Sequence, residues 1–478
     1  MQSYLQDFPP PTVSNDAQTT NWDGDNDPEN PQNWPAWKKA CTCAIISLIA
    51  YIVGFASSID SAVIPQASRR FHVSDVSESL ATTLFLVGFG CGAPFAGPLS
   101  ETYGRNPIYL TNFALFSCWI LGAALAPNYG AQLVFRFLAG VCGSTPFTTA
   151  GGTLADIFNH HTRFKIFPFF ALCGFLGPMT GPMVGGWIGQ SGIDWRWADW
   201  VTLCICGGIF ALIVFFLPET YAPVILKWKA QSLHVGSHTT VQGPVKESLR
   251  AKLATALSRP FIILSTEPIV AIWSGYLTLI YAVAFCFFSS VPYIFGDTYG
   301  FSQGPSYMMF VSVSVGLVIC AFATPLFAIL VGREFAAAAA QGKPSAGPEA
   351  VLWWALIGGP FLPISLLWMA WSARSSVSYW SPMMSAAFFG FSILCVFIST
   401  YAYLMQRYAK VAASALVGIT LIRYICGGTM VIVAIPMFEN LGVHHALTIF
   451  AAISCAFTPL PYILYFRAKK QRNAEERL

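Results

Sequence analysis

The segment GPLSETYGRNP, Gly97–Pro107, separates two apolar stretches at residues 77–99 and 108–126. Both stretches are continuously apolar, without the alternation of polar and apolar residues that is typical of strands in a membrane barrel. A helix of about 20 residues, rising 1.5 Å per residue, spans the roughly 30 Å hydrocarbon core of a bilayer. The segment therefore predicts a short connection between two membrane-spanning helices.

The composition extends this interpretation to the whole chain. Of the 478 residues, 55% are hydrophobic and 10% are charged, whereas about 25% of residues are charged in ordinary globular domains. So much apolar surface requires the bilayer as its solvent, where helices satisfy their own backbone polar groups. The polar, acidic N-terminal region lacks the features of a cleavable signal peptide, so we expect the first span to direct insertion.

The apolar stretches predict an all-α polytopic membrane protein with twelve transmembrane helices in two six-helix halves. We expect a disordered cytosolic N-terminal tail (1–37), a first half (38–218), a cytosolic linker (219–262), a second half (263–467) and a cytosolic tail (468–478). The spans are predicted at 40–64, 77–99, 108–126, 131–154, 166–189 and 199–218, and then at 268–294, 305–330, 349–371, 381–404, 412–436 and 445–466.

The distribution of Lys and Arg predicts the orientation. If both termini are cytosolic, most of the 26 basic residues are cytosolic, and the outer loops contain only Arg69, Arg70, Arg196 and Arg374. An additional or a missing span would disturb this asymmetry, so the charge pattern supports twelve spans.

Cysteine and histidine give no indication of a metal or redox centre. The 13 Cys fall in apolar stretches, without the spacing of metal ligands or of a disulfide framework. The 7 His all lie in polar segments, and no nucleophile–base pair appears within the predicted spans. We therefore expect no enzyme, no catalytic residues, no metal site and no nucleic-acid partner.

The connection at Gly97–Pro107 also contains residues suited to a conformational latch. Gly97 allows two helices to approach closely, and Glu101 and Arg105 can interact with the charge and dipole of a neighbouring helix end on the cytosolic side. Such a latch must break when the cytosolic face opens. The alternative interpretation is a plain tight turn with solvated charges.

Two further spans contain unusual residues. The fourth, RFLAGVCGSTPFT at Arg136–Thr148, places an arginine in an apolar segment, where a charge is costly and usually functional. The fifth, GFLGPMTGPMVGGWIG at Gly174–Gly189, predicts a helix face without side chains that packs against the eighth span. The residues of this face are Gly177, Pro178, Gly181, Pro182, Gly185 and Gly186.

In order and spacing, these segments resemble the loop, fourth-span and antiporter signatures of the major facilitator superfamily. The resemblance extends from about residue 21 to the end of the chain and implies two six-helix halves that rock around a central cavity. Further stretches are similar to the fungal twelve-span drug:proton antiporter branch, which includes polyamine and multidrug exporters: NWDGDNDPENPQNWPAWKK (Asn21–Lys39), GGTLADIF (Gly151–Phe158), LPETYAPVIL (Leu217–Leu226) and AASALVGITLIRY (Ala412–Tyr424).

The resemblance also implies where function lies, in a cavity lined by spans one, four, seven and ten. Asp60 and Arg136 fall at nearly the same predicted depth, so they are expected to pair, although Asp60 is close enough to the surface for simple hydration. Aromatic residues would add cation–π surface, although ordinary helix packing explains them equally well. The expected proton-coupling and cavity residues are Asp60, Arg136, Tyr276, Tyr281, Phe285, Tyr401 and Arg423, and the expected latch residues are Gly97, Glu101, Gly104, Arg105 and Asp156.

Three positions depart from the family pattern. Ser289 and Ser290 precede Pro292 where many relatives have an acid, Gln406 replaces an aspartate, and Asp60 stands where relatives more often have a neutral residue. These differences put polyamine or cation specificity in doubt and are compatible with a proton site that has moved.

The sequence therefore favours a monomeric, proton-coupled exporter of small organic molecules such as drugs, toxins or fungal secondary metabolites. We expect an antiporter that uses the proton gradient and no bound cofactor, located in the plasma membrane or, alternatively, in the vacuolar membrane. A second interpretation is an organic-anion carrier, because Arg136 and Arg423 outnumber Asp60 within the spans. A third is a non-transporting membrane sensor, although sensors on this scaffold usually add long soluble tails.

Overall fold

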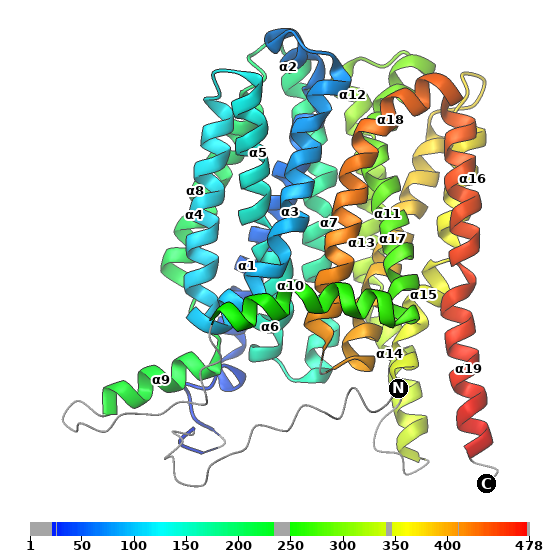
Figure 1. Cartoon of the computed structure of the whole chain (residues 1–478). Coiled ribbons are helices and arrows are strands. Elements are labelled where there is room, and N and C mark those ends of the chain that lie inside the picture. The colour runs from blue at the N-terminus through cyan, green and yellow to red at the C-terminus, as the bar shows by residue number, and fades with distance from the viewer. Residues whose placement is uncertain (1–21, 25, 234–248, 341–346, 410, 476–478) are drawn as a thin grey trace.

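The computed structural model describes residues 22–24, 26–233, 249–340, 347–409 and 411–475. Every element in these ranges is helical, and the long helices run side by side in one bundle (Figure 1). Large apolar side chains such as Phe215, Phe322 and Trp371 are more than half exposed on it, as expected where lipid replaces water. The predicted all-α membrane architecture is confirmed.

The first half contains six crossings, of which the fourth is divided near Pro146, because proline cannot donate the N–H of a continuous helix. Its elements are α1 (Ala36–Ser58), η3 (Ile59–Ala62), α2 (Ile64–Phe71), α3 (Asp75–Tyr103), α4 (Arg105–Ala124), α5 (Tyr129–Gly143), α6 (Thr145–Ile157), α7 (His160–Gln190) and α8 (Trp197–Phe216).

The second half is more often interrupted, and Pro325 and Pro360 lie at two of the divisions. Its elements are α11 (Pro268–Tyr293), η4 (Ile294–Thr298), α12 (Gln303–Met308), α13 (Phe310–Phe322), α14 (Thr324–Ala340), η5 (Pro348–Leu352), α15 (Trp353–Gly358), α16 (Phe361–Ser372), α17 (Trp380–Arg407), α18 (Ala412–Phe457) and α19 (Pro459–Glu475).

The described helices agree with twelve crossings, although only ten uninterrupted segments are long and apolar enough to cross a membrane. The divided fourth crossing, α5 with α6, is not among the ten. The last segment, Ala412–Lys470, has 59 residues, about twice what one crossing needs. Gly442 divides it, because its φ of 73° lies in the left-handed region that turns the chain back.

The two halves meet along two pairs of helices. Helix α3 contacts α18, and α7 contacts α12 and α13. Within the predicted linker, the structure forms α9 (Ala222–Leu233) and α10 (Leu249–Thr266), while residues 234–248 lie outside the described ranges. Helix α10 runs across one end of the bundle, where it contacts α3 and α18 (Figure 1).

The described part of the N-terminal region is held against this linker. Lys229 on α9 forms ion pairs with Asp23, Asp27 and Glu29 at N–O distances of 2.7, 2.8 and 3.5 Å. The hydrogen bond from Lys229, together with backbone donors, lowers the pKa of Asp27 from its ordinary 3.8 to about 2. The carboxylate therefore stays ionised near neutral pH. Within the predicted disordered tail, residues 26–37 contain these ion pairs and the short helix η2 (Pro31–Asn33).

The glycines of the fifth crossing bring α7 against α1. A Cβ atom at Gly177, Gly181 or Gly185 would lie 2.2 to 2.4 Å from atoms of Tyr51, Ser58 or Ile59 in α1 and η3. The predicted face without side chains is present, but its partner is mainly the first crossing. Gly186 and Gly189 meet the eighth crossing, through Tyr307 and Gln303 of α12.

Candidate transport site

A buried charge cluster lies inside the first half, where α1, α5 and α8 meet. Arg136 of α5 is 1% exposed and forms ion pairs with Asp60 of η3 and Asp199 of α8, which are 5% and 1% exposed. Arg136 Nη2 donates to Asp199 Oδ1 at 2.8 Å, and Arg136 Nη1 donates to the carbonyl of Ala56 at 2.8 Å. The structure thus places Asp60 against Arg136 and adds a second carboxylate.

The local helix ends explain how these groups meet. Ala56 lies in the last turn of α1, where carbonyls lack donors from their own helix, so the guanidinium can hydrogen-bond there. The 3-10 turn that follows positions Asp60 beside the same guanidinium. Asp199 lies in the first turn of α8, where the helix dipole favours a carboxylate.

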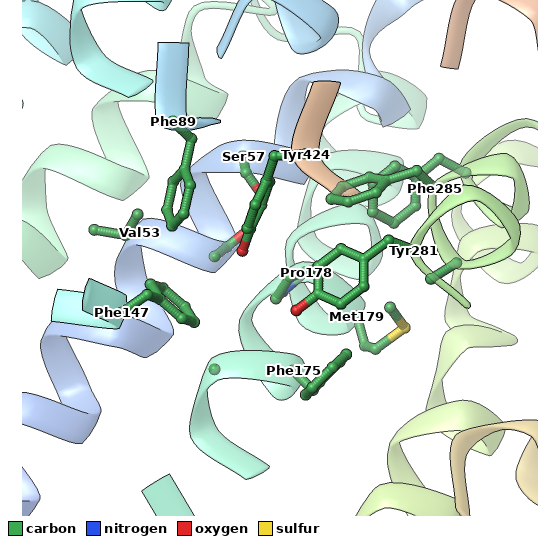
Figure 2. A pocket seen from close by; sticks show the side chains of 14 residues that line it. Val53, Ser57, Phe89, Phe147, Phe175, Pro178, Met179, Tyr281, Phe285 and Tyr424 are labelled. Atoms are coloured by element: carbon green, nitrogen blue, oxygen red, sulfur yellow. The ribbon is translucent and has the colours of Figure 1, made fainter. Parts of the chain in front are cut away.

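An aromatic pocket lies between the two halves, next to this cluster. The first half contributes Val53 and Ser57 from α1 and Phe89 from α3, and the second half contributes Tyr281 and Phe285 from α11 (Figure 2). Its empty volume, which includes space open to solvent, is about 460 Å³. The other labelled lining residues are Phe147, Phe175, Pro178, Met179 and Tyr424.

Aromatic contacts join the halves around the pocket. Phe89 stacks on Tyr424 with ring centroids 4.1 Å apart, and Phe175 meets Tyr281 at 5.6 Å. Each pair combines one ring from each half, so any separation of the halves must change the shape of the pocket. This geometry suits a site that opens by rocking.

A second buried arginine, Arg423 of α18, lies behind the rings of the second half. It is fully buried, and Nε, Nη1 and Nη2 all lack hydrogen-bond partners. Its guanidinium carbon lies 4.5 Å from the ring centroid of Tyr281, 5.2 Å from that of Tyr424 and 5.5 Å from that of Tyr401. Phe397 is the fourth ring around it, at 5.3 Å.

The predicted cavity residues separate into different environments. Tyr281 and Phe285 line the pocket, whereas Tyr401 belongs to the rings around Arg423. Tyr276 stacks on Phe457 with centroids 5.6 Å apart, inside the second half, and is not among the lining residues of this pocket. Tyr276 is five residues before Tyr281, which at 3.6 residues per turn places the two side chains about 140° apart around α11.

The predicted latch region forms a network, but not with all of the expected members. Arg105 Nε lies 3.2 Å from Asp156 Oδ2, and Arg105 Nη1 donates to Ser100 Oγ at 2.6 Å. Glu219 accepts from the backbone N–H groups of Arg105 and Asn106 and so caps α4. These partners lie in the first half and, with Glu219, at the first residue of the linker, so the network joins helix ends of the first half to the start of the linker.

Two glycines and one acid predicted for the latch have different surroundings in the structure. Gly104 has a φ of 104°, and a Cβ there would lie 2.4 Å from Glu219 Oε2, so glycine is required. The expected close helix approach at Gly97 is wrong for this structure, because no atom lies within 4 Å of a Cβ built there. Glu101 is exposed and forms no ion pair within the described ranges, because Glu219 occupies the helix end instead.

Sequence reasoning missed Asp199 and Glu219. Asp199 stands among Trp195, Trp197 and Trp200, a group that indicates a membrane interface and draws attention away from the acid. The sequence does contain an indication of its role, because Asp199 begins an apolar stretch on the same predicted side of the membrane as Asp60 and Arg136. Glu219 lies within LPETYAPVIL, a stretch that indicates the family by its resemblance but does not indicate which residue Glu219 contacts.

The twelve crossings, the two halves and the central pocket together define a polytopic membrane transport protein. The chain belongs to the Major Facilitator Superfamily, since its residues 46–431 match the model of that family.

Relatives agree with this assignment. The MFS-type transporter kojT of Aspergillus oryzae is 45% identical over 93% of this chain and 80% of its own length. The major facilitator superfamily multidrug transporter mdrA of Aspergillus fumigatus is 32% identical over 92% of this chain and 73% of its own. Among solved structures, the proton:xylose symporter XylE has a similar fold, with a TM-score of 0.65 and 13% identity over 90% of this chain and 97% of XylE.

Proposed function

We propose that this transporter exports small organic molecules in exchange for protons, using the proton gradient and no bound cofactor. The relative that is named a multidrug transporter supports export of such solutes. The pocket between the halves is the proposed solute site, because it is the place where rings from both halves meet. The proton site is the buried cluster of Asp60, Arg136 and Asp199.

The composition of this cluster is the observation that carries the proposal. Two carboxylates face one guanidinium, so the cluster has one excess negative charge when both acids are ionised. A buried charge without compensation is costly, and one bound proton removes it. Asp60 Oδ1 is buried and has no hydrogen-bond partner, so it can accept the proton without losing a bond.

Arg196 is the other cation near the cluster, and its donors are used elsewhere. It donates to the carbonyls of Ala124 and Ala126 at 3.0 and 3.2 Å and pairs with the exposed Asp194 at 3.5 Å. It therefore reduces the excess negative charge at Asp199 only from a distance. The cluster therefore still needs one bound proton to compensate its excess negative charge.

Helix α1 connects the proton site to the solute pocket. Ala56 and, just beyond the helix, Asp60 contact Arg136, while Val53 and Ser57 on the same segment line the pocket. Protonation of Asp60 weakens its attraction to Arg136 and so releases a restraint on this end of α1. A proton bound at the cluster and a solute bound in the pocket can thus favour different arrangements of one helix.

The proposal includes a monomer in the plasma membrane with both termini and the linker in the cytosol. The start of α1, the end of α19 and the helices α9 and α10 all lie at the same end of the bundle (Figure 1). The sequence places most basic residues in these segments and in the loops predicted at the same end, which favours the cytosolic side.

A second candidate function is transport of organic anions, and one observation favours it. Arg423 is buried without an ion-pair partner in the described part of the chain, whereas Arg136 is matched by two carboxylates. A solute that brings its own negative charge would compensate Arg423. This possibility concerns the substrate and is compatible with proton coupling.

The test uses purified full-length protein in liposomes with an acidic interior. The solutes are the cationic dye rhodamine 6G and the anionic dye fluorescein, and protein-free liposomes give the background. We expect the wild-type protein to accumulate at least one dye above background. Asp60→Asn should reduce gradient-driven accumulation to background while dye exchange without a gradient continues, because the carboxylate that binds the proton is lost.

Matched variants sharpen this test. Asp199→Asn determines which of the two carboxylates takes the proton, and the exposed Asp194→Asn should behave as wild type. Arg136→Ala should abolish both accumulation and exchange, since it leaves two buried carboxylates unpaired. Gradient-driven accumulation that survives in both Asp60→Asn and Asp199→Asn would exclude the cluster as the proton site.

A further inference from the structure

Arg423 is in an energetically costly environment. Its side chain is 0% exposed, and none of its three nitrogen atoms has a hydrogen-bond partner. No ion pair joins it to a carboxylate within the described ranges, although a guanidinium presents five N–H donors. A charge buried in this way persists in a membrane protein mostly where it has a function.

Arg136 provides an internal comparison. Both arginines are buried in spanning helices at the level of the bundle interior, yet Arg136 contacts Asp60, Asp199 and the carbonyl of Ala56. Arg423 is instead surrounded by four aromatic side chains, of which the ring of Tyr281 is nearest at 4.5 Å, and it pairs with no carboxylate of the described residues. Cation–π contacts offset part of the desolvation cost but leave the N–H donors unused. A partner that compensates the charge of Arg423 and uses these donors would be an anion.

We propose that Arg423 binds the acidic group of the transported solute, and that the solute class is a small aromatic molecule with a carboxylate or a similarly acidic group. This proposal rests on the proposed function of the pocket as the solute site. A guanidinium binds a carboxylate through two parallel hydrogen bonds, and the surrounding rings provide flat surfaces for an aromatic body.

The position of Arg423 between two pockets supports this assignment. Tyr281 and Tyr424 separate it from the pocket of Figure 2, which they line. On its other side, Tyr401 stacks on Phe167 with centroids 5.8 Å apart, and Phe167 lines a second pocket. A solute in either pocket would reach the guanidinium only after these rings rotate.

The second pocket has the charge expected of an anion entrance. Arg163, near the start of α7, lines it together with Gln406 of α17, and no acidic residue is among its lining residues. An anion that enters at this end meets Arg163 first and the buried Arg423 further in. Gln406 is neutral, so it adds no negative charge to this entrance.

Thermal unfolding of purified full-length protein tests the proposal with three probes of the same size. Benzoate is an anion, benzamide is neutral and benzylamine is a cation. We expect benzoate alone to raise the Tm in a concentration-dependent way. Arg423→Gln should weaken the apparent affinity for benzoate by at least about tenfold, since charge-assisted hydrogen bonds are lost, whereas Arg423→Lys should keep part of it.

The unliganded variants separate a binding role from a structural one. Arg423→Gln should have a Tm equal to or above that of the wild type without ligand, because it removes an uncompensated buried charge. Arg163→Gln, which does not depend on the fold around Arg423, should weaken benzoate binding by a few-fold. Equal shifts with benzoate and benzamide would overturn the proposal, and so would a benzoate shift that Arg423→Gln leaves unchanged or the absence of any shift.

The outcome can be distinguished from a failure of the proposed function. If benzoate does not bind but rhodamine 6G is still accumulated with the proton gradient, the anion site is wrong and proton-coupled export stands. If benzoate binds through Arg423 while Asp60→Asn and Asp199→Asn both retain coupling, the proton site is wrong and the anion site stands.

Discussion

At the scale of single residues, Arg105 shows how one side chain holds several helix ends together. It reaches Asp156 of α6 and Ser100 of α3, and its guanidinium lies 5.0 Å from the ring centroid of Tyr221. The backbone N–H of Arg105 also donates a hydrogen bond to the carboxylate of Glu219. Arg105 therefore links the ends of α3, α4 and α6.

Arg105→Ala should leave the protein inserted and folded but slow its transport cycle by about tenfold. The substitution leaves Asp156 partly buried without its partner, which costs about 1–3 kcal/mol, and disconnects α3 from α6. The initial rate of dye accumulation in proteoliposomes measures the effect. Arg105→Lys keeps the charge without the planar fork and should fall between the two. A normal rate in Arg105→Ala would show that the network has no role in gating.

The charge cluster shows how far single residues could be predicted from the sequence. Counting residues along two spans placed Asp60 and Arg136 at one depth, because helix rise is constant. The same counting cannot state which face of α8 turns inward, since a tryptophan-rich helix start fits an interface equally well. Asp199 was therefore found only in the structure. The lack of a partner for Arg423 likewise depends on three-dimensional contacts.

At the scale of elements, hydrophobicity predicted the crossings, while their partners depended on packing. The apolar length of α7 and its glycine repeat could be predicted from the sequence. The glycines, however, pack mainly against the first crossing and less against the eighth. A helix face without side chains indicates that another helix packs closely against it, but it does not identify that helix. The contacts of the N-terminal acids could not be predicted for a related reason, since their partner Lys229 is more than 200 residues away.

Gly181→Ala should destabilise the protein, because the new Cβ would lie 2.4 Å from Ser58 Oγ and 2.7 Å from the carbonyl oxygen of Phe55. Backbone atoms cannot yield, so α1 and α7 must separate, at a cost of about 1–3 kcal/mol. Gly207→Ala on α8 is the matched control, since nothing lies within 4 Å of its Cβ, and helix propensity alone should stabilise it by up to about 1 kcal/mol. The Tm of each purified variant measures the difference, and equal values would contradict the packing argument.

At the scale of the whole molecule, the halves are joined at the end of the bundle that carries α2 and α12 (Figure 1). Gln303 of α12 donates to the carbonyl of Ala62 at 2.6 Å, and Gln66 of α2 donates to Gln303 Oε1 at 2.9 Å. Tyr307 also donates to the carbonyl of Ser61 at 3.1 Å. At the opposite end, Phe167 stacks on Tyr401 across the halves. The pocket thus lies between two sets of contacts that join the halves, one at each end of the bundle. Alternating access requires these two sets to open in turn.

Weakening the contacts between α2 and α12 should favour the state that, in the proposed orientation, is open to the outside. In Gln66→Ala/Gln303→Ala, several hydrogen bonds between the halves are lost, each worth about 0.5–1.5 kcal/mol, so the outward-open population should rise by roughly fivefold or more. Ser57→Cys in the pocket reports this state through its labelling rate with a membrane-impermeant maleimide, with the cysteines of the parent chain as background. Asn440→Ala is the control, because its exposed side chain bonds only to the carbonyl of Pro436 in its own helix. Labelling as slow in the double variant as in this control would mean that the glutamines do not hold the halves together, and that the aromatic contacts around the pocket keep the outer face closed.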